Sequence, residues 1–373
     1  MHLEHISLVN FKNYRQISLD FSPGVNCFVG HNGAGKTNLL DAVHYLSFCK
    51  SYFNSFDNQN IMHGEEMFVI QGIFNKNGNE EEIYCAQKRN ERKQFKRNKK
   101  DYVRLSEHIG LLPVVMISPT DTELVLEGSE VRRKFIDSII SQADTEYLNN
   151  LIEYNKVLLQ RKAMLKHFYD TQSWDNTLMA IWDEQLLDRG RAIFNKRQSF
   201  TNEFSELFRK LYAGISGSRE SVKLQYSSQL MEGDFAELLA KALPKDRAVL
   251  YSTTGIHKDD WLFFKEEYSL KKFASQGQQK SFIIALKLAQ VHFLKEHFNS
   301  PPIVLLDDMF DKLDEERVNF LIDMITGNDF GQVFITDTDH FRLKKLLENK
   351  AKECIIIPIE EGRLQESEQH DYA

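Results

Sequence analysis

The residues with the clearest chemical potential lie near the start of the chain, in a glycine-rich segment of eight residues. Its sequence fits Gly-x-x-x-x-Gly-Lys-Thr, the Walker A pattern of phosphate-binding loops. Glycines let backbone N–H groups converge on a phosphate, and a following helix adds the partial positive charge of its N-terminus. The candidate nucleotide-binding residues are therefore Gly30, His31, Asn32, Gly33, Ala34, Gly35, Lys36 and Thr37.

Two side chains of this loop have specific predicted roles. We expect the Lys36 ammonium to contact the β- and γ-phosphates of ATP, and the Thr37 hydroxyl to bind Mg²⁺. The alternative is a glycine-rich turn that matches the pattern by chance, and the flanking sequence disfavours it. The mostly apolar run Val25–Val29 predicts a buried strand before the loop, and apolar residues at helical spacing follow over 39–46.

Two adjacent aspartates near the other end of the chain could complete such a site. The apolar residues Ile303–Leu306 predict a buried strand that ends at Asp307 and Asp308. Ligands of open α/β sheets bind at the carboxyl edge, so this strand would present both carboxylates to the nucleotide. We expect Asp307 to help hold Mg²⁺. Asp308 and Lys36 are the candidate catalytic residues, with Asp308 orienting or deprotonating the attacking water.

A third candidate element is the sequence Ser-Gln-Gly-Gln at 275–278, which opens an apolar helix. Ser275 is a natural N-cap, and Gly277 permits the close approach of another backbone or a phosphate. In isolation, an ordinary capped helix explains this tetrapeptide. In combination with the Walker A loop and the paired aspartates, we interpret Ser275, Gly277 and Gln278 as nucleotide-binding residues.

The elements that must position these residues predict an α/β fold with a phosphate-loop core. Residues 65–117 predict a largely antiparallel sheet flanking that core, and we include Val114–Ile117 in this sheet. No proline occurs between Pro119 and Pro244, which predicts a helical insertion. The expected organisation is a head formed by residues 1–124 and 245–360, a helical arm at 125–244 and a disordered tail at 361–373.

Apolar residues repeat every seven positions in the expected arm. The repeat lasts about three heptads, which predicts two or three packed helices and is short for an extended coiled coil. Its members are Leu151, Leu158 and Leu165 in a first run, and Leu186, Ile193, Phe200 and Leu207 in a second, with Trp182, Phe204 and Leu211 at intermediate positions.

The composition excludes several classes of protein. Hydrophobic residues make up 42% and charged residues 27%, which is typical of a globular chain. The sequence lacks the roughly 18-residue apolar run of a membrane-spanning helix and a signal-peptide pattern, so we expect a cytoplasmic protein without membrane association. The four cysteines are widely spaced and favour neither zinc nor disulfides. A net charge of −7 excludes a uniformly basic surface but not a local basic groove.

The order of the motifs resembles that of the ABC-type ATPase heads. Walker A, Ser-x-Gly-Gln and apolar-Asp-Asp follow one another and are followed by Asp311-Lys-Leu-Asp314. More specifically, essentially the whole chain resembles the RecF family of DNA replication and repair proteins. The stretches that carry this resemblance are Leu8–Tyr14, Ile117–Asp121, Arg132–Asp137 and Gly255–Asp260.

The resemblance implies an ABC-type head with an inserted helical arm. In that superfamily, the Ser-x-Gly-Gln element of one subunit covers the γ-phosphate held by the Walker loop of another, and the loop resembling Asp311–Asp314 crosses the interface. The family's function implies a homodimer that forms on ATP, binds single-stranded or gapped DNA and helps to load recombinase. Recombinational repair, replication restart, the SOS response and the partners RecO and RecR are implied in the same way.

Two departures from the superfamily pattern affect the expected chemistry. Asp308 stands where transporter-type heads usually carry Glu, one methylene longer, so we expect slow ATP hydrolysis. Thr336-Asp337 occupies the place of a switch histidine, which leaves the role of Asp337 open.

Several basic residues are candidate DNA contacts. Between Lys88 and Lys100, eight of thirteen residues are Lys or Arg, which fits either a phosphate-contacting hairpin or a solvated turn. The resemblance favours Arg132-Arg133-Lys134. His257 and Lys258 have either a nucleotide- or DNA-binding role or a structural one. Four residues of the arm are either DNA contacts or an exposed helix face: Arg189, Arg191, Lys196 and Arg197.

Three other functions fit parts of the pattern. A transporter-type ABC ATPase would carry its signature much closer to the Walker loop and would lack a large arm. A chromosome-organising head of the SMC type would need longer coiled coils. A nuclease-fused ATPase would need further acidic metal-binding residues after Asp314.

Overall fold

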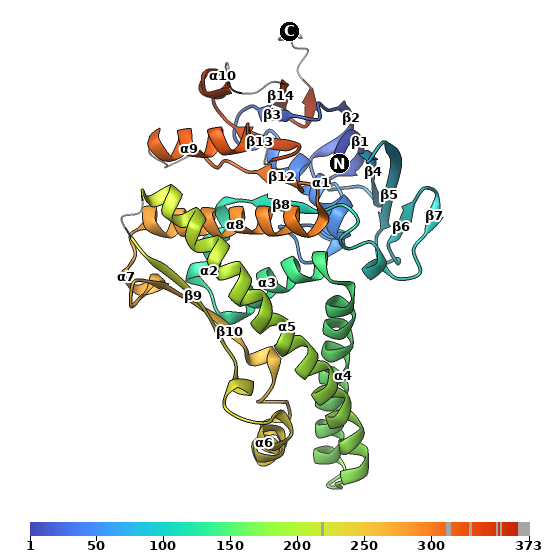
Figure 1. Ribbon diagram of the computed structural model, residues 1–373. Helices are drawn as coiled ribbons and strands as arrows, with labels where there is room; N and C mark the ends of the chain where they lie inside the picture. The colour runs from blue at the N-terminus through green and yellow to red at the C-terminus, as the bar shows by residue number, and fades with distance from the viewer. Residues whose placement is uncertain (218–219, 311–314, 328–329, 348–349, 351–352, 365–373) are drawn as a thin grey trace. The chain divides into compact units, whose positions relative to one another are not determined.

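The computed structural model describes residues 1–217, 220–310, 315–327, 330–347, 350 and 353–364 (Figure 1). It divides the chain into two compact units. The head unit comprises Met1–Asp121 and Leu286–Ala373, and the arm unit comprises Thr122–Ala285. The loop 311–314 and the segment 365–373, for which the sequence suggested an interface loop and a disordered tail, lie outside the described residues.

A six-stranded sheet of the head unit has the order β15-β14-β3-β13-β12-β8 (Figure 1). Its strands from β14 to β8 are parallel, and β15 pairs antiparallel with β14 at the edge. The apolar run of the sequence forms β3 in the interior of the sheet, with all its residues buried. The strands are β3 (Val25–Val29), β8 (Val114–Ile117), β12 (Ile303–Leu306), β13 (Val333–Asp337), β14 (Cys354–Glu360) and β15 (Arg363–Leu364).

Two predictions about this sheet are corrected. Strand β8 was expected in the antiparallel sheet, but it pairs parallel with β12. All four of its residues are apolar and buried, as in a strand covered on both faces. Strand β15 (Arg363–Leu364) lies in the stretch expected to be disordered, but it pairs with Ile359 and Glu360.

A second six-stranded sheet of the head unit is antiparallel throughout, with the order β2-β1-β4-β5-β6-β7. It confirms the predicted flanking sheet. Helix α1 (Lys36–Phe48) contacts strands of both sheets, and its buried leucines join one apolar core with them. The strands are β1 (His2–Phe11), β2 (Tyr14–Asp20), β4 (Met67–Lys76), β5 (Asn79–Lys88), β6 (Gln94–Arg97) and β7 (Lys100–Asp101). The described part of the head also contains α9 (Glu315–Ile325), α10 (His340–Leu347) and the C-terminal part of α8 (Gln276–Phe298).

The arm unit contains helices and a small three-stranded sheet of order β11-β10-β9. Helices α4 and α5 pack against each other, and aspartates cap both of their N-termini: Asp144 accepts from the Tyr147 N–H, and Asp175 from the Thr177 N–H. The helices are α2 (Glu123–Leu126), α3 (Ser129–Ala143), α4 (Thr145–Asp170), α5 (Asn176–Ser216), α6 (Phe235–Val249) and α7 (Leu270–Phe273), and α8 (Gln276–Phe298) begins here. The strands are β9 (Val222–Ser227), β10 (Asp260–Lys265) and β11 (Tyr268–Ser269).

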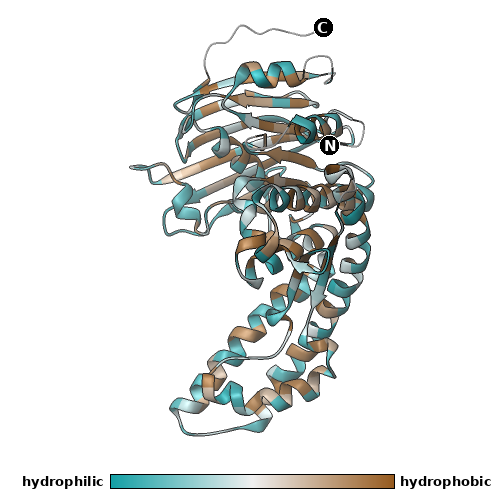
Figure 2. Ribbon diagram, turned by 90° about the vertical axis from the view of Figure 1, so that its left-hand side faces the viewer, coloured by the Kyte–Doolittle hydropathy of each residue, from teal (hydrophilic) through white to brown (hydrophobic). Residues whose placement is uncertain are grey.

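The predicted heptad positions lie in helices, as expected. Only some of these positions are on the buried faces of the helices. Leu165, Leu186, Ile193, Phe200 and Phe204 are buried. The other members lie at the margin of the buried face, where they are half-buried: Leu151, Leu158, Trp182, Leu207 and Leu211. Figure 2 shows hydrophobic and hydrophilic residues alternating along the long helices, as expected for helices with one buried side.

The arm boundary expected at 244 is corrected to Ala285. Strand β9 lies inside the stretch expected to be helical, and β10 pairs with it over Asp260–Lys265. Trp261 and Phe263 of β10 are buried, so this later segment packs with the arm. The Ser-Gln-Gly-Gln element therefore belongs to the arm unit, and not to the head as expected. None of the described helices is both long enough and apolar enough to span a membrane.

Candidate nucleotide-binding site

The glycine-rich loop connects β3 to α1 in the head unit, as the sequence predicts. Gly30 and Gly35 have φ values of +156° and +118°, a backbone conformation that side chains disfavour. A Cβ atom at Gly35 would lie 2.6 Å from the Asn13 amide nitrogen and 2.7 Å from the Tyr14 hydroxyl oxygen. A Cβ atom at Gly30 would collide with the carbonyl oxygen of Ile359. Backbone conformation and close packing both require glycine here.

Asn13 connects this loop to the neighbouring turn between β1 and β2. Its side-chain amide donates to the Ala34 carbonyl oxygen at 3.1 Å, and its amide oxygen accepts from Asn38 at 2.7 Å. The Gly362 N–H donates to the same Ala34 oxygen at 2.9 Å. Asn13 lies in a stretch that carries the family resemblance, but sequence spacing gave no reason to include it in the site.

The Lys36 side chain lies against the loop itself. Its ammonium group donates to the carbonyl oxygens of Gly30 at 2.8 Å and His31 at 3.0 Å, and only 5% of the residue is exposed. His31, Asn32 and Gly33 form the exposed side of the loop. The Lys36 ammonium is thus held beside the loop backbone, where it would form a charge-assisted hydrogen bond with a bound phosphate.

The structure brings the two halves of the predicted metal site together. The Thr37 hydroxyl donates to Asp307 Oδ1 at 2.7 Å. Burial raises the pKa of the Asp307 carboxyl, while the hydrogen bonds from Thr37 and Thr336 act in the opposite direction. Asp308 follows Asp307 with a left-handed backbone at φ +44°, and its side chain is partly exposed.

Thr336, which the resemblance places with Asp337 at the position of the switch histidine, was not among the predicted site residues but belongs to this site. Its hydroxyl donates to Asp307 Oδ1 at 2.9 Å and accepts from the Asp308 N–H at 2.9 Å. The following residue, Asp337, is buried and pairs with Arg342 at 2.6 Å. The contacts described for Asp337 therefore connect it to α10. The adjacency of β12 and β13 could have suggested Thr336, but the sequence alone does not give strand order.

The residues present fit a nucleotide-bound Mg²⁺ ion. The Thr37 hydroxyl and the Asp307 carboxylate are oxygen donors, the ligand type that Mg²⁺ prefers. Within the described part of the chain, no group of three or more His, Cys, Asp or Glu residues could hold a metal ion. Water and phosphate oxygens would have to supply the remaining ligands, as is usual for Mg²⁺ at phosphate sites.

Ser275 and Gln278 form a reciprocal cap at the start of α8 in the arm unit. The Ser275 N–H donates to Gln278 Oε1 at 2.9 Å, and the Gln278 N–H donates to Ser275 Oγ at 3.3 Å. The Gln278 amide also donates to Glu220 at 2.6 Å. The predicted N-cap is confirmed, and the nucleotide-binding role of Ser275, Gly277 and Gln278 stays a prediction.

The basic segment Lys88–Lys100 forms part of β5, β6 and β7 and the turns between them. Some of its cations are held within the head: Arg97 pairs with Glu81, and Lys93 pairs with Asp57 at 2.8 Å. Four cationic residues of the segment are exposed: Lys88, Arg92, Lys99 and Lys100.

The basic cluster that the family resemblance favoured has internal partners. Arg132 makes two hydrogen bonds to the Asp260 carboxylate, at 2.7 and 3.0 Å, and Arg133 donates to the Asp259 carbonyl oxygen at 2.6 Å. Two of the stretches that carry the resemblance thus pack against each other. Arg197 is 1% exposed and pairs with Asp137 and Asp259, so its expected exposure is wrong.

His257 has a structural role in the arm unit. Its Nε2–H donates to the Ser252 carbonyl oxygen at 2.9 Å, and its Nδ1 accepts from the Tyr154 hydroxyl at 2.9 Å. Burial lowers the pKa of His257 to about 4, so the ring is uncharged at neutral pH. Lys258 beside it is exposed.

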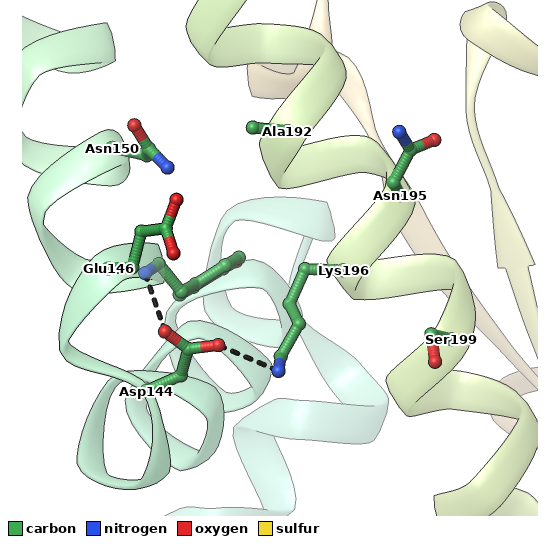
Figure 3. Close-up of a pocket in the computed structure, with 8 residues that line it drawn as sticks. Asp144, Glu146, Asn150, Ala192, Asn195, Lys196 and Ser199 are labelled. Carbon is green, nitrogen blue, oxygen red and sulfur yellow. Dashed lines mark hydrogen bonds and ion pairs between the residues drawn. The ribbon is translucent and has the colours of Figure 1, made fainter.

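A shallow pocket lies between α4 and α5, and Figure 3 shows the side chains that line it. Lys196 pairs there with Asp144 at 2.7 Å, while Asp144 also caps α4. Arg189 and Arg191 donate to Asn150 at 3.0 Å and to Asp234 at 2.7 Å. These cations of the arm therefore have partners within the unit.

The fold and site together define an ABC-type ATPase head with an inserted arm. A family model described as the RecF/RecN/SMC N terminal domain matches residues 2–360. The Smc head domain with an extended coiled coil from Pyrococcus furiosus has a TM-score of 0.57 at 17% identity, covering 98% of this chain and 95% of that chain, which shows the shared fold.

Within that class, the chain belongs to the RecF family. It is 50% identical over 349 residues to the DNA replication and repair protein RecF of Flavobacterium johnsoniae, covering 94% of this chain and 97% of the relative. The corresponding protein of Phocaeicola vulgatus is 48% identical over 368 residues, covering 98% of each chain. The solved structure of the recombination mediator protein RecF-ATP in the RecFOR pathway has a TM-score of 0.88 at 28% identity, covering 98% of this chain and 97% of that one. The predicted family and fold class are confirmed.

Proposed function

We propose that this chain is an ATP-dependent DNA-binding protein of recombinational repair and replication restart. The hydrogen bond between Thr37 and Asp307 carries the ATP-dependent part of the proposal, because it joins a Walker A loop to an acidic residue suited to Mg²⁺. The relatives support it: they are DNA replication and repair proteins, and one solved relative is a RecF-ATP structure of the RecFOR pathway.

The loop Gly30–Thr37 binds the phosphates of ATP through its backbone N–H groups and the Lys36 ammonium. Thr37 and Asp307 hold Mg²⁺, which neutralises phosphate charge when bound. Asp308 orients the attacking water. Its side chain is one methylene shorter than glutamate, so ATP hydrolysis is slow and the ATP-bound state is long-lived.

Each chain supplies two incomplete parts of the site, and ATP joins them between two copies. The Walker loop of one copy holds the nucleotide, and Ser275, Gly277 and Gln278 of the other copy cover its γ-phosphate. The reciprocal cap of α8 prepares this element, because it fixes the first turn and leaves the partial positive charge at the helix start.

The exposed cations at the β5–β7 end of the head bind the DNA backbone. Lys99 and Lys100 lie at the turn between β6 and β7, and both are exposed. Arg132 and Arg133 are less suited to DNA, because they are paired with residues 259 and 260. The DNA is single-stranded or gapped, and the ATP-bound dimer works in the cytoplasm with RecO and RecR to load recombinase and to support the SOS response.

The test is the affinity for a fluorescently labelled gapped duplex with no nucleotide, ADP or ATP. We expect ATP to strengthen binding in the wild type, and Lys36→Ala to abolish this effect by weakening ATP binding about 100-fold. The double variant Lys99→Ala/Lys100→Ala should lower the slope of log affinity against log salt by about 2. The double variant Lys162→Ala/Lys166→Ala, which removes two exposed cations of α4, is the matched control. The proposal would be contradicted if the DNA affinity were the same in all three nucleotide states and in Lys36→Ala.

A further inference from the structure

Thr336 lies at the carboxyl end of β13, next to the strand β12 that ends before the paired aspartates (Figure 1). The residue is completely buried. Its hydroxyl oxygen is 2.9 Å from Asp307 Oδ1, 2.9 Å from the Asp308 backbone nitrogen and 3.5 Å from Asp308 Oδ1. One hydroxyl group thus contacts both residues of the pair.

The chemistry of a hydroxyl determines which contacts are made. It has one hydrogen to donate and two lone pairs to accept with. The Asp308 N–H is a donor, so it takes a lone pair of Thr336. The single hydrogen of Thr336 then goes to the nearer carboxylate oxygen, Asp307 Oδ1. This oxygen also accepts from the Thr37 hydroxyl at 2.7 Å, so hydroxyls from the first turn of α1 and from the end of β13 fix its position.

The bond to the Asp308 N–H also acts on the backbone. Asp308 has φ +44°, in the left-handed region that residues other than glycine disfavour. The hydrogen bond to Thr336 restrains this conformation, which sets the direction in which the Asp308 side chain leaves the strand end. The orientation of both carboxylates therefore depends on the same hydroxyl.

We propose, on the basis of the Mg²⁺–ATP site described above, that Thr336 is a positioning residue for that site. Its hydroxyl holds the Asp307 carboxylate in the orientation that binds Mg²⁺. It also holds the Asp308 backbone in the conformation that directs the Asp308 side chain toward the nucleotide. Thr336 does not contact the loop carbonyls that hold Lys36. Removal of the Thr336 hydroxyl therefore weakens Mg²⁺ binding at the ATP site. The affinity of the loop for ATP without Mg²⁺ stays the same.

The experiment measures binding of a fluorescent ATP analogue in EDTA and over a series of Mg²⁺ concentrations. Thr336→Val keeps the shape of the side chain and removes the hydroxyl. We expect the half-saturating Mg²⁺ concentration to rise about tenfold, with the affinity in EDTA unchanged. Thr336→Ser, which keeps the hydroxyl, should restore the wild-type value. Thr326→Val is the matched control, because the contact described for its hydroxyl is a hydrogen bond to the Ile322 carbonyl oxygen of α9, away from the paired aspartates.

The outcomes separate this role from a structural one and from the underlying function. A general loss of packing would lower binding in EDTA as well, and would overturn the positioning role. An unchanged Mg²⁺ midpoint in Thr336→Val would overturn it too. If Thr336→Val does not fold, Thr336→Ala removes the same hydroxyl and must give the same shift. Failure of the wild-type chain to bind ATP would instead refute the proposed function itself.

Discussion

The Thr37 hydroxyl and the Asp307 carboxylate are hydrogen-bonded at 2.7 Å although 270 positions separate them in the chain. The parallel sheet explains this proximity, because β3 and β12 both flank β13 and all three strands end at the same edge. The whole arm unit is inserted in the chain between them. The head unit therefore supplies both predicted Mg²⁺-binding residues, Thr37 at the start of α1 and Asp307 at the end of β12, without a residue of the arm unit.

Gly35→Ala should be far more damaging than Gly33→Ala, its matched control in the same loop. A methyl group at Gly35 would press on Asn13 and Tyr14 at φ +118°, whereas no atom lies within 4 Å of the Cβ position at Gly33, where φ is +82°. Both variants are strained, and only Gly35→Ala also displaces the supporting turn. We expect Gly35→Ala to lose ATP binding and Gly33→Ala to retain most of it, as measured by equilibrium nucleotide titration. Equal losses would contradict the packing role of the Asn13 turn.

Arg197→Ala should destabilise the protein by about 3–5 kcal/mol. The substitution leaves Asp259, whose side chain is completely buried, without its ion-pair partner. Arg191→Ala removes a pair whose side chains are about half exposed and screened by solvent, and should change the unfolding midpoint far less. Urea unfolding of the two variants provides the comparison. Similar urea midpoints would show that the ion pairs of Arg197 with Asp137 and Asp259 do not stabilise the arm.

The stability of the protein should decrease as the pH falls from about 6.5 to about 4. Burial lowers the pKa of His44, His108 and His257 to about 4, so in this interval the unfolded chain binds more protons than the folded one. Each histidine contributes a slope of up to about 1.4 kcal/mol per pH unit. The raised pKa values of Asp259 and Asp307 act in the opposite direction, because the folded state takes up their protons more readily.

His108 allows this prediction to be tested at one position. Its ring is completely buried and bridges the Leu46 carbonyl oxygen and the Tyr102 hydroxyl. In His108→Gln, the free energy of unfolding should fall less steeply with decreasing pH than in the wild type. The slopes of the two proteins should differ by about 1 kcal/mol per pH unit. Urea unfolding at pH 7, 6 and 5 measures the slope. A slope identical to that of the wild type would contradict the assigned protonation.

Ser275→Arg should leave ATP binding to the single chain intact and prevent the ATP-dependent dimer, because the long side chain would fill the proposed interface. The substitution also removes the Ser275 cap of α8, at a cost of about 1 kcal/mol. Ser275→Ala removes the same cap without adding bulk, so it separates the two effects and should still dimerise. Loss of ATP binding in monomeric Ser275→Arg would show that the two-chain site is wrong.

Local patterns were sufficient to predict much of the fold and the centre of the site. The Walker loop, β3, β12 and the paired aspartates follow from neighbouring residues, and their contact follows from the rule that ligands bind at the carboxyl edge. Thr336 and Asn13 could not be found in this way, because their roles depend on which strand or turn lies beside them. Arg197 was misjudged because a charged residue is buried only when partners distant in sequence compensate it. Strand β9 was missed, although Val222, Leu224 and Tyr226 alternate with polar residues as in a half-buried strand.

The most direct measurement is the mass of the wild-type chain by light scattering, with no nucleotide, with ADP and with ATP, each in the presence of Mg²⁺. The single chain has a mass of 43.6 kDa. If ATP joins the Walker loop of one copy to the Ser275 element of another, ATP alone should double this mass, and a gapped duplex should strengthen the effect. A mass that stays the same while ATP is bound would contradict the two-chain site, and would leave the Ser275–Gln278 element as a helix cap.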